Sequence, residues 1–177
     1  MPAFHAIAVP HDDILAGRLT MEVFAADLGQ VYQGSAPDEY QDADRFFQKT
    51  FVTEGLQNLL AVVRRRLEGQ GGDPVIQIQT PFGGGKTHAL IAMYHRAREW
   101  GAVPAVLVGT DLPAQETLWG VLAEQIAGTR AGFEGRTAPG KAALRALLEP
   151  HQPLLILMDE VLEYATKAAG VRVEEST

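Results

Sequence analysis

A lysine and a threonine follow three consecutive glycines near the middle of the chain, in the stretch Thr80-Pro81-Phe82-Gly83-Gly84-Gly85-Lys86-Thr87. At the start of a helix, the N–H groups of a glycine-rich turn bind phosphate oxygens, the lysine reaches the outer phosphates and the hydroxyl coordinates Mg²⁺. The stretch therefore predicts a loop that binds the phosphates of a nucleotide. The residues that we assign to this contact are Gly83, Gly84, Gly85, Lys86, Thr87 and His88.

Two adjacent carboxylates form a second candidate group. Asp159 and Glu160 follow the apolar run 154–158, which is typical of a buried parallel strand. In phosphate-loop enzymes an aspartate at this point holds Mg²⁺, and a glutamate beside it polarises the attacking water. A solvated turn after a core strand is the alternative interpretation of the pair. We assign Asp159, with Thr87, to Mg²⁺ binding, and Glu160, with Lys86, to catalysis.

The segments on both sides of the glycines must position these groups. Residues 75–79 alternate apolar side chains with glutamine, which predicts a short, mostly buried strand that leads into the loop. After the loop, an apolar stripe at helical spacing continues until Gly101 ends it. The complete pattern begins with glycine, whereas this loop begins with Thr80, which must keep φ below zero. We interpret the stretch as a variant phosphate loop.

Residues 1–73 are predicted to form a mainly helical amino-terminal segment. Apolar residues with the spacing i, i+3, i+4 and i+7 predict a helix whose N-cap is Thr53 and which Gly69 terminates. A shorter amphipathic segment is expected between Ile14 and Phe24. The acidic residues 38–44 are expected to form a solvated connector.

Residues 74–177 alternate strand and helix patterns, which predicts a parallel sheet covered by helices. A strand is expected at residues 105–108, between the loop and the Asp-Glu pair. Asp111 and Pro113 are expected to mark the start of the helix that follows it. Together with the two motifs, this alternation predicts an α/β phosphate-loop NTPase core.

Composition narrows the classes of protein that fit. The 177 residues are 46% hydrophobic, as in soluble globular proteins, and no apolar stretch approaches the ~20 residues of a membrane helix. No basic-then-apolar secretory signal begins the chain, so we expect a cytoplasmic protein without membrane contact. The lack of cysteine excludes disulfides and thiolate metal sites. The net charge is −7 with its acidic excess in residues 1–50, so direct DNA binding by this region is not expected.

Four stretches carry a resemblance to a known family. They are Phe24-Ala25-Ala26-Asp27-Leu28, Phe46-Phe47-Gln48-Lys49-Thr50, Gly71-Gly72-Asp73-Pro74-Val75-Ile76-Gln77 and Gln79-Thr80-Pro81-Phe82-Gly83-Gly84-Gly85-Lys86-Thr87-His88-Ala89-Leu90. In them the chain resembles the amino-terminal part of large prokaryotic AAA-type ATP-binding proteins. That family is typical of anti-phage defence islands and includes the ATPase of BREX-type systems. The resemblance implies that a threonine at the first position of the loop is usual in the family.

The resemblance also implies an AAA-like ATPase of the additional-strand class, whose members are far longer than 177 residues. In that class a further strand lies in the sheet between the phosphate-loop strand and the Asp-Glu strand, and we expect this chain to lack it. The implied fold is therefore an incomplete parallel sheet. We expect the chain to behave as a fragment with reduced stability and turnover in isolation.

The leading functional hypothesis is Mg²⁺-dependent ATP hydrolysis that drives or times a conformational change in a defence complex. An alternative is an ATP-gated scaffold that orders its protein partners and seldom hydrolyses ATP. A phosphate-loop kinase of a small metabolite would need a basic lid over the phosphates, and no basic cluster follows the loop. The preference for adenine or guanine and the formation of a homo-oligomer are left open by these patterns.

Overall fold

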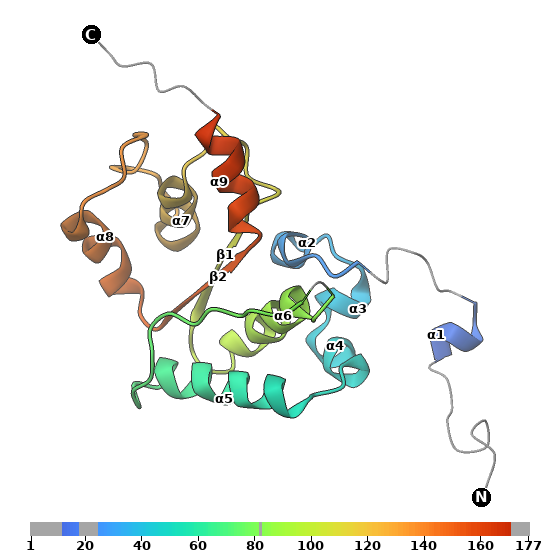
Figure 1. Ribbon diagram of the computed structural model, residues 1–177. Coiled ribbons are helices and arrows are strands. Elements are labelled where there is room, and N and C mark those ends of the chain that lie inside the picture. Colours follow the sequence, from blue (N-terminus) through green and yellow to red (C-terminus); the bar gives the residue numbers. More distant parts are fainter. Residues whose placement is uncertain (1–11, 18–24, 82, 171–177) are drawn as a thin grey trace, which may run out of the picture.

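The computed structural model describes residues 12–17, 25–81 and 83–170 (Figure 1). Over these residues the protein is mixed α/β. Its sheet has two parallel strands, β1 (Val103–Val108) and β2 (Leu154–Asp159). Val103 pairs with Leu154 and Val108 with Asp159, so the two strands end at the same edge. Both strands were predicted from sequence, and both are confirmed.

Helices occupy most of the remaining described chain. Before the sheet lie α1 (Asp12–Leu15), α2 (Leu28–Gln33), α3 (Asp38–Gln41), α4 (Ala43–Lys49), α5 (Glu54–Leu67) and α6 (Lys86–Ala97). After β1 come α7 (Leu118–Ala127), α8 (Lys141–Leu148), a short 3-10 helix (Glu149–His151) and, after β2, α9 (Val161–Ala169). The amphipathic segment expected between Ile14 and Phe24 is represented by α1 alone, because residues 18–24 lie outside the described residues.

Local capping explains where several helices begin and end. The Thr53 hydroxyl accepts a hydrogen bond from the Leu56 N–H at 3.2 Å at the start of α5, and Gly69 has φ 74° just beyond its end, as predicted. The predicted start of the next helix is wrong. Asp111 lies in a turn and Pro113 in irregular backbone, and α7 begins after Thr117, whose hydroxyl accepts from the Gly120 N–H. A cap with a hydroxyl acceptor decides the start more strongly than an aspartate several residues earlier.

The prediction of a solvated connector at residues 38–44 is also wrong. These residues form α3 and the start of α4. Asp38 pairs with Arg45, and Glu39 pairs with Lys49. Asp42 caps α4 by accepting from the Arg45 N–H at 2.9 Å. Asp38 and Glu39 are therefore paired with cations seven and ten residues later, and Asp42 with a helix start.

The prediction of a strand at residues 75–79 is wrong. Within the described chain, the segment 74–81 pairs with neither β1 nor β2. Val75 is 81% exposed and Ile76 is 41% exposed, while Ile78 packs against the core. An extended segment becomes a strand only when a neighbour completes its backbone hydrogen bonds, and none of the described strands lies in that position. Alternation of apolar residues was therefore not sufficient to predict a strand.

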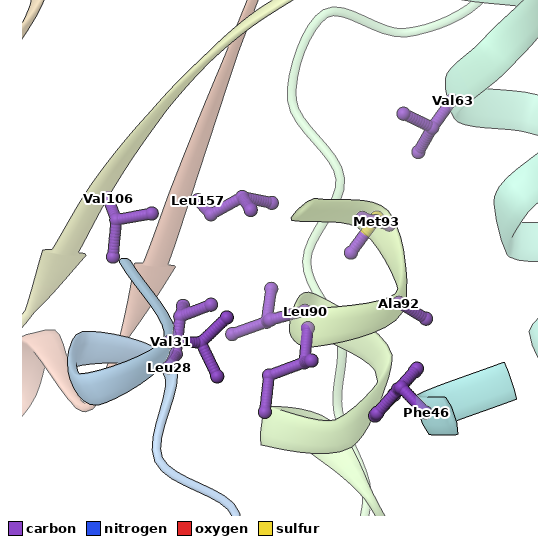
Figure 2. Close-up of a cluster of buried hydrophobic side chains, with 10 residues drawn as sticks. Leu28, Val31, Phe46, Val63, Leu90, Ala92, Met93, Val106 and Leu157 are labelled. Atoms are coloured by element: carbon purple, nitrogen blue, oxygen red, sulfur yellow. The ribbon is translucent and has the colours of Figure 1, made fainter. Parts of the chain in front are cut away.

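Two hydrophobic clusters cover the two faces of the sheet. In the first cluster, residues of α2, α4, α5 and α6 pack against β1 and β2 (Figure 2). Its buried members are Leu28, Val31, Phe46, Val63, Leu90, Ile91, Ala92, Met93, Val106 and Leu157. The second cluster packs α7 and α8 on the opposite face through Ala105, Leu107, Leu122, Ala123, Ile126 and Leu147. The first cluster joins residues from both sides of position 73, so α6 is held against the sheet and the amino-terminal helices together.

The outer edge of β1 is covered by a side chain. The Gln125 amide of α7 accepts from the Val106 N–H and donates to the Val106 carbonyl, both at 2.8 Å. These two bonds imitate the pairing that a further strand would make. The amide therefore satisfies the edge of a sheet that has only two described strands.

Among residues 12–17, 25–81 and 83–170, none of the helices combines the length and the apolar character that a bilayer crossing requires.

Candidate functional site

The glycine-rich loop turns directly into α6. Gly83 and Gly85 have φ values of 75° and 73°, which side chains other than glycine rarely adopt. Gly85 is the N-cap of α6 and, having no side chain, makes no side-chain cap. The N–H groups of the first turn, which begins at Lys86, therefore lie at the positive end of the helix without a side-chain acceptor from the cap residue.

Thr80, which replaces the usual first glycine of the loop, contacts other residues of the loop. Its side chain lies so close to Gly84 that a Cβ at position 84 would collide with it. The Lys86 ammonium lies 3.4 Å from Thr80 Oγ1 and 3.5 Å from the Thr80 carbonyl oxygen, at the long end of the hydrogen-bond range. Thr80 therefore explains the need for glycine at position 84 and offers two oxygens to the lysine.

The loop helix and the Asp-Glu strand meet at one hydrogen bond. Thr87 Oγ1 donates to Asp159 Oδ2 at 2.6 Å, although the residues are 72 positions apart in sequence. Both side chains are half-buried. A hydroxyl bonded to an ionised carboxylate at this distance is a strong, charge-assisted contact. Two oxygen groups that the sequence assigns to Mg²⁺ are therefore adjacent.

Glu160 lies at the same edge in an unusual backbone conformation. Its φ is 50°, in the left-handed region that costs a residue other than glycine about 1–3 kcal/mol. The Thr110 hydroxyl donates to Glu160 Oε2 at 3.0 Å, and Lys167 Nζ donates to the Thr110 carbonyl oxygen at 2.9 Å. Thr110, two residues after the end of β1, therefore holds the carboxylate, and Lys167 of α9 holds Thr110. Lys167 was not predicted from the sequence, because its position in a helix carries no local signal.

Thr87, Thr110, Asp159 and Glu160 line a hollow of about 90 Å³. Its lining combines the start of α2 with the loop helix and both strand ends: Ala26, Asp27, Leu28, Thr87, Val108, Thr110, Asp159 and Glu160. Next to it, burial raises the pKa of the Asp111 carboxyl, and the negative charges of Asp27 and Glu160 raise it further. The contribution of Asp27 was not predicted, since only the fold brings α2 to the strand ends.

His88 differs from the other residues assigned to the nucleotide. Its backbone belongs to the first turn of α6, but its side chain contacts α4 and the residue after it. His88 Nε2 lies 2.8 Å from Thr50 Oγ1, and its ring centroid lies 4.5 Å from that of Phe46. Of the six residues assigned to the nucleotide, only Thr87 is among those that line the hollow. Any contact of His88 with a ligand in the hollow would therefore use its backbone N–H.

Fold and site together define a mixed α/β protein in which a glycine-rich loop opens a helix beside the carboxyl end of a parallel strand pair. The family model described as the DUF499 N-terminal domain matches residues 4–111, more than half of the chain. The chain belongs to the DUF499 family. The match includes the loop, α6 and β1 and ends at Asp111, before Asp159 and Glu160. Comparisons with curated proteins and with solved structures found no match.

Proposed function

We propose that the protein binds ATP and hydrolyses it with Mg²⁺. The observation that carries this proposal is the 2.6 Å contact between Thr87 Oγ1 and Asp159 Oδ2. It joins two motifs that the sequence presents separately, at the point where a phosphate loop and a metal-binding carboxylate have to meet. Hydroxyl and carboxylate oxygens are the hard ligands that Mg²⁺ takes from proteins, so the residues present fit this ion.

The roles of the side chains follow from their positions. The loop N–H groups of residues 83–87 and the Lys86 ammonium would hold the β- and γ-phosphates. Thr87 and Asp159 would orient the metal, and a bound Mg²⁺ would neutralise charge on the phosphate oxygens. The Glu160 carboxylate, at the rim of the hollow, would accept a proton from the attacking water.

We place this activity in an AAA-like ATPase of the additional-strand class that works in a prokaryotic anti-phage defence complex. The four stretches of resemblance support this assignment. The unpaired segment 74–81 is also consistent with it, because in that class a further strand separates the phosphate-loop segment from β2. The protein partners would be the other components of the complex, and a cytoplasmic location would follow.

One observation favours the second candidate, an ATP-gated scaffold with little turnover. The Glu160 carboxylate is engaged by the Thr110 hydroxyl, and Lys167 fixes the Thr110 backbone. A base held in this way has to leave or share its hydrogen bond before it can take a proton from water. Slow hydrolysis in a protein that binds ATP tightly would favour the scaffold.

The test measures ATP binding by calorimetry and phosphate release for the wild type and three variants. Lys86→Ala should weaken binding at least about 10-fold, since it removes a charge-assisted contact to phosphate. Glu160→Gln should bind within about 2-fold of wild type and hydrolyse roughly 100-fold more slowly. Lys141→Ala is the matched control, because Lys141 also follows a glycine N-cap at the start of a helix, α8.

Each outcome decides between the hypotheses. If Lys86→Ala and Lys141→Ala bind ATP equally well, the loop does not hold the phosphates and the proposal is wrong. If Glu160→Gln hydrolyses ATP at the wild-type rate, Glu160 is not the base. Tight binding by a wild-type protein that releases no phosphate would establish the scaffold instead.

A further inference from the structure

The amino-terminal helices contact the phosphate-loop helix through a cluster of aromatic and histidine rings. Phe46 of α4 is 1% exposed and points toward α6 (Figure 2). Its ring centroid lies 4.5 Å from that of His88 and 5.2 Å from that of His95. Both histidines belong to α6, in its first and third turns, and face the same layer of helices. The ring of Phe46 therefore packs against two turns of α6 at once.

The hydrogen bonds of the two histidines show where their protons lie. Thr50 Oγ1 has one hydrogen and lies 2.7 Å from the Phe46 carbonyl oxygen, which can only accept. The 2.8 Å contact between Thr50 Oγ1 and His88 Nε2 is therefore a bond in which the histidine donates. His95 Nε2 lies 2.8 Å from the Tyr40 carbonyl oxygen and donates as well. Each histidine thus anchors α6 to the amino-terminal helices with one N–H group.

The two anchors differ in their acceptors, a Thr50 hydroxyl after α4 and a Tyr40 carbonyl in α3, and in their distance from the loop. His88 follows Thr87 directly, whereas His95 lies seven residues later, roughly 10 Å further along the helix. We propose that His88 and Thr50 are a positioning pair that fixes the first turn of α6, so that phosphate binding at the loop is coupled to the docking of α4. This inference rests on the proposed function, because it concerns the same loop.

The physical reason is the weakness of an uncapped helix start. Gly85 makes no side-chain cap, so the first turn of α6 depends on neighbours to stay ordered. The Thr50–His88 bond attaches this turn to α4 from the side. Without the bond, the contact between Thr87 and Asp159 would remain but the side of the turn that faces α4 would lose its anchor, and the added cost of ordering it on nucleotide binding would lower affinity. Coupling is reciprocal, so a bound nucleotide would also stabilise the docking of α4.

Histidine-to-phenylalanine variants separate this role from ordinary packing. His88→Phe and His95→Phe each keep a ring against Phe46 and remove one N–H donor. Thr50→Val removes the hydroxyl, and Thr50→Ser keeps it. Binding of a fluorescent ATP analogue with Mg²⁺, the KM and kcat of hydrolysis, and thermal melting are measured for the whole chain.

We expect His88→Phe and Thr50→Val to raise the Kd and the KM by roughly 5- to 10-fold, the equivalent of one hydrogen bond, with kcat unchanged. His95→Phe should lower the melting temperature about as much as His88→Phe and keep the Kd within about 2-fold, and Thr50→Ser should bind like wild type. Equal affinities for His88→Phe and His95→Phe would overturn the inference. If a variant fails to fold, amide hydrogen exchange of residues 43–50 in the wild-type protein tests the inference instead. Docking of α4 that is coupled to phosphate binding requires ATP to slow this exchange, and unchanged exchange would overturn the inference.

These outcomes distinguish the inference from the function on which it rests. A wild-type chain that binds ATP, with variants that bind equally well, refutes the positioning pair and leaves the proposed function intact. A wild-type chain that binds no nucleotide refutes both.

Discussion

Replacing Thr87 with valine removes one hydroxyl from the contact between α6 and β2 and nearly preserves the shape of the side chain. Thr87 Oγ1 donates to Asp159 Oδ2 at 2.6 Å. A hydrogen bond to a charged acceptor contributes about 1.5–3 kcal/mol to the free energy of unfolding. A domain of this size loses roughly 2–4 °C of melting temperature per kcal/mol. We therefore expect Thr87→Val to melt roughly 3–12 °C below the wild type when no nucleotide is added.

The same substitution removes a metal ligand if the proposed function is correct. A ligand at 100 times its Kd stabilises the folded state by about 2.7 kcal/mol, which should raise the melting temperature of the wild type by roughly 5–11 °C. With Mg²⁺ and ATP, Thr87→Val should lose most of this rise. Thr87→Ser keeps the hydroxyl and should retain it.

Scanning calorimetry with ATP and either Mg²⁺ or a chelator measures both effects on the same protein. If Thr87→Val gains as much from Mg²⁺ and ATP as the wild type does, Thr87 is not a metal ligand. If its melting temperature without nucleotide equals that of the wild type, the bond to Asp159 does not stabilise the fold. The two results are independent, so either can refute its part of the reasoning.

Two further predictions concern stability. Gln125→Leu should cost about 2–4 kcal/mol in urea unfolding, because the Val106 N–H and carbonyl both lose a partner at the sheet edge, whereas the exposed Gln57→Leu should stay within about 0.5 kcal/mol. Equal costs would contradict the edge-capping role. Burial lowers the pKa of His88 and His95 below the usual value of about 6.5. The stability contributed by the neutral rings is therefore complete above about pH 6.5, and it is lost as the pH falls through the lower pKa values of the folded state. Unfolding from about pH 7.5 to about pH 5 should show this loss in the wild type and a smaller one when both histidines are phenylalanine; identical profiles would exclude these rings as its cause.

Several features that depend on neighbours in sequence were predicted correctly, although the Thr117 cap of α7 was missed. The Thr53 cap acts on the N–H of Leu56, and Gly69 follows Leu67, the last residue of α5, by two positions. The strand at Leu154–Asp159 was predicted because a continuous apolar run bounded by proline has few other structures available. In the same way, three glycines before Lys86 predicted a turn that opens α6.

Predictions failed where distant groups decide the structure. Residues 75–79 have the alternation of a strand but lack an adjacent strand in the described fold, so their backbone stays outside the sheet. The acidic region 38–44 is helical, and Arg45 and Lys49 pair with Asp38 and Glu39. A solvated connector would have left these charges unpaired, and the pairing depends on helices that the acidic composition does not reveal.

The amino-acid sequence by itself determined which groups are available for chemistry: a glycine loop before Lys86 and Thr87, and a carboxylate pair after an apolar strand. Only the tertiary structure decided that Thr87 bonds to Asp159, that Thr110 holds Glu160 and that the side chain of His88 faces Thr50. Loops, caps and apolar runs act over a few residues, so sequence reveals them. Contacts between side chains far apart in the chain depend on how the helices pack against both faces of the sheet, and that packing exists only in the folded molecule.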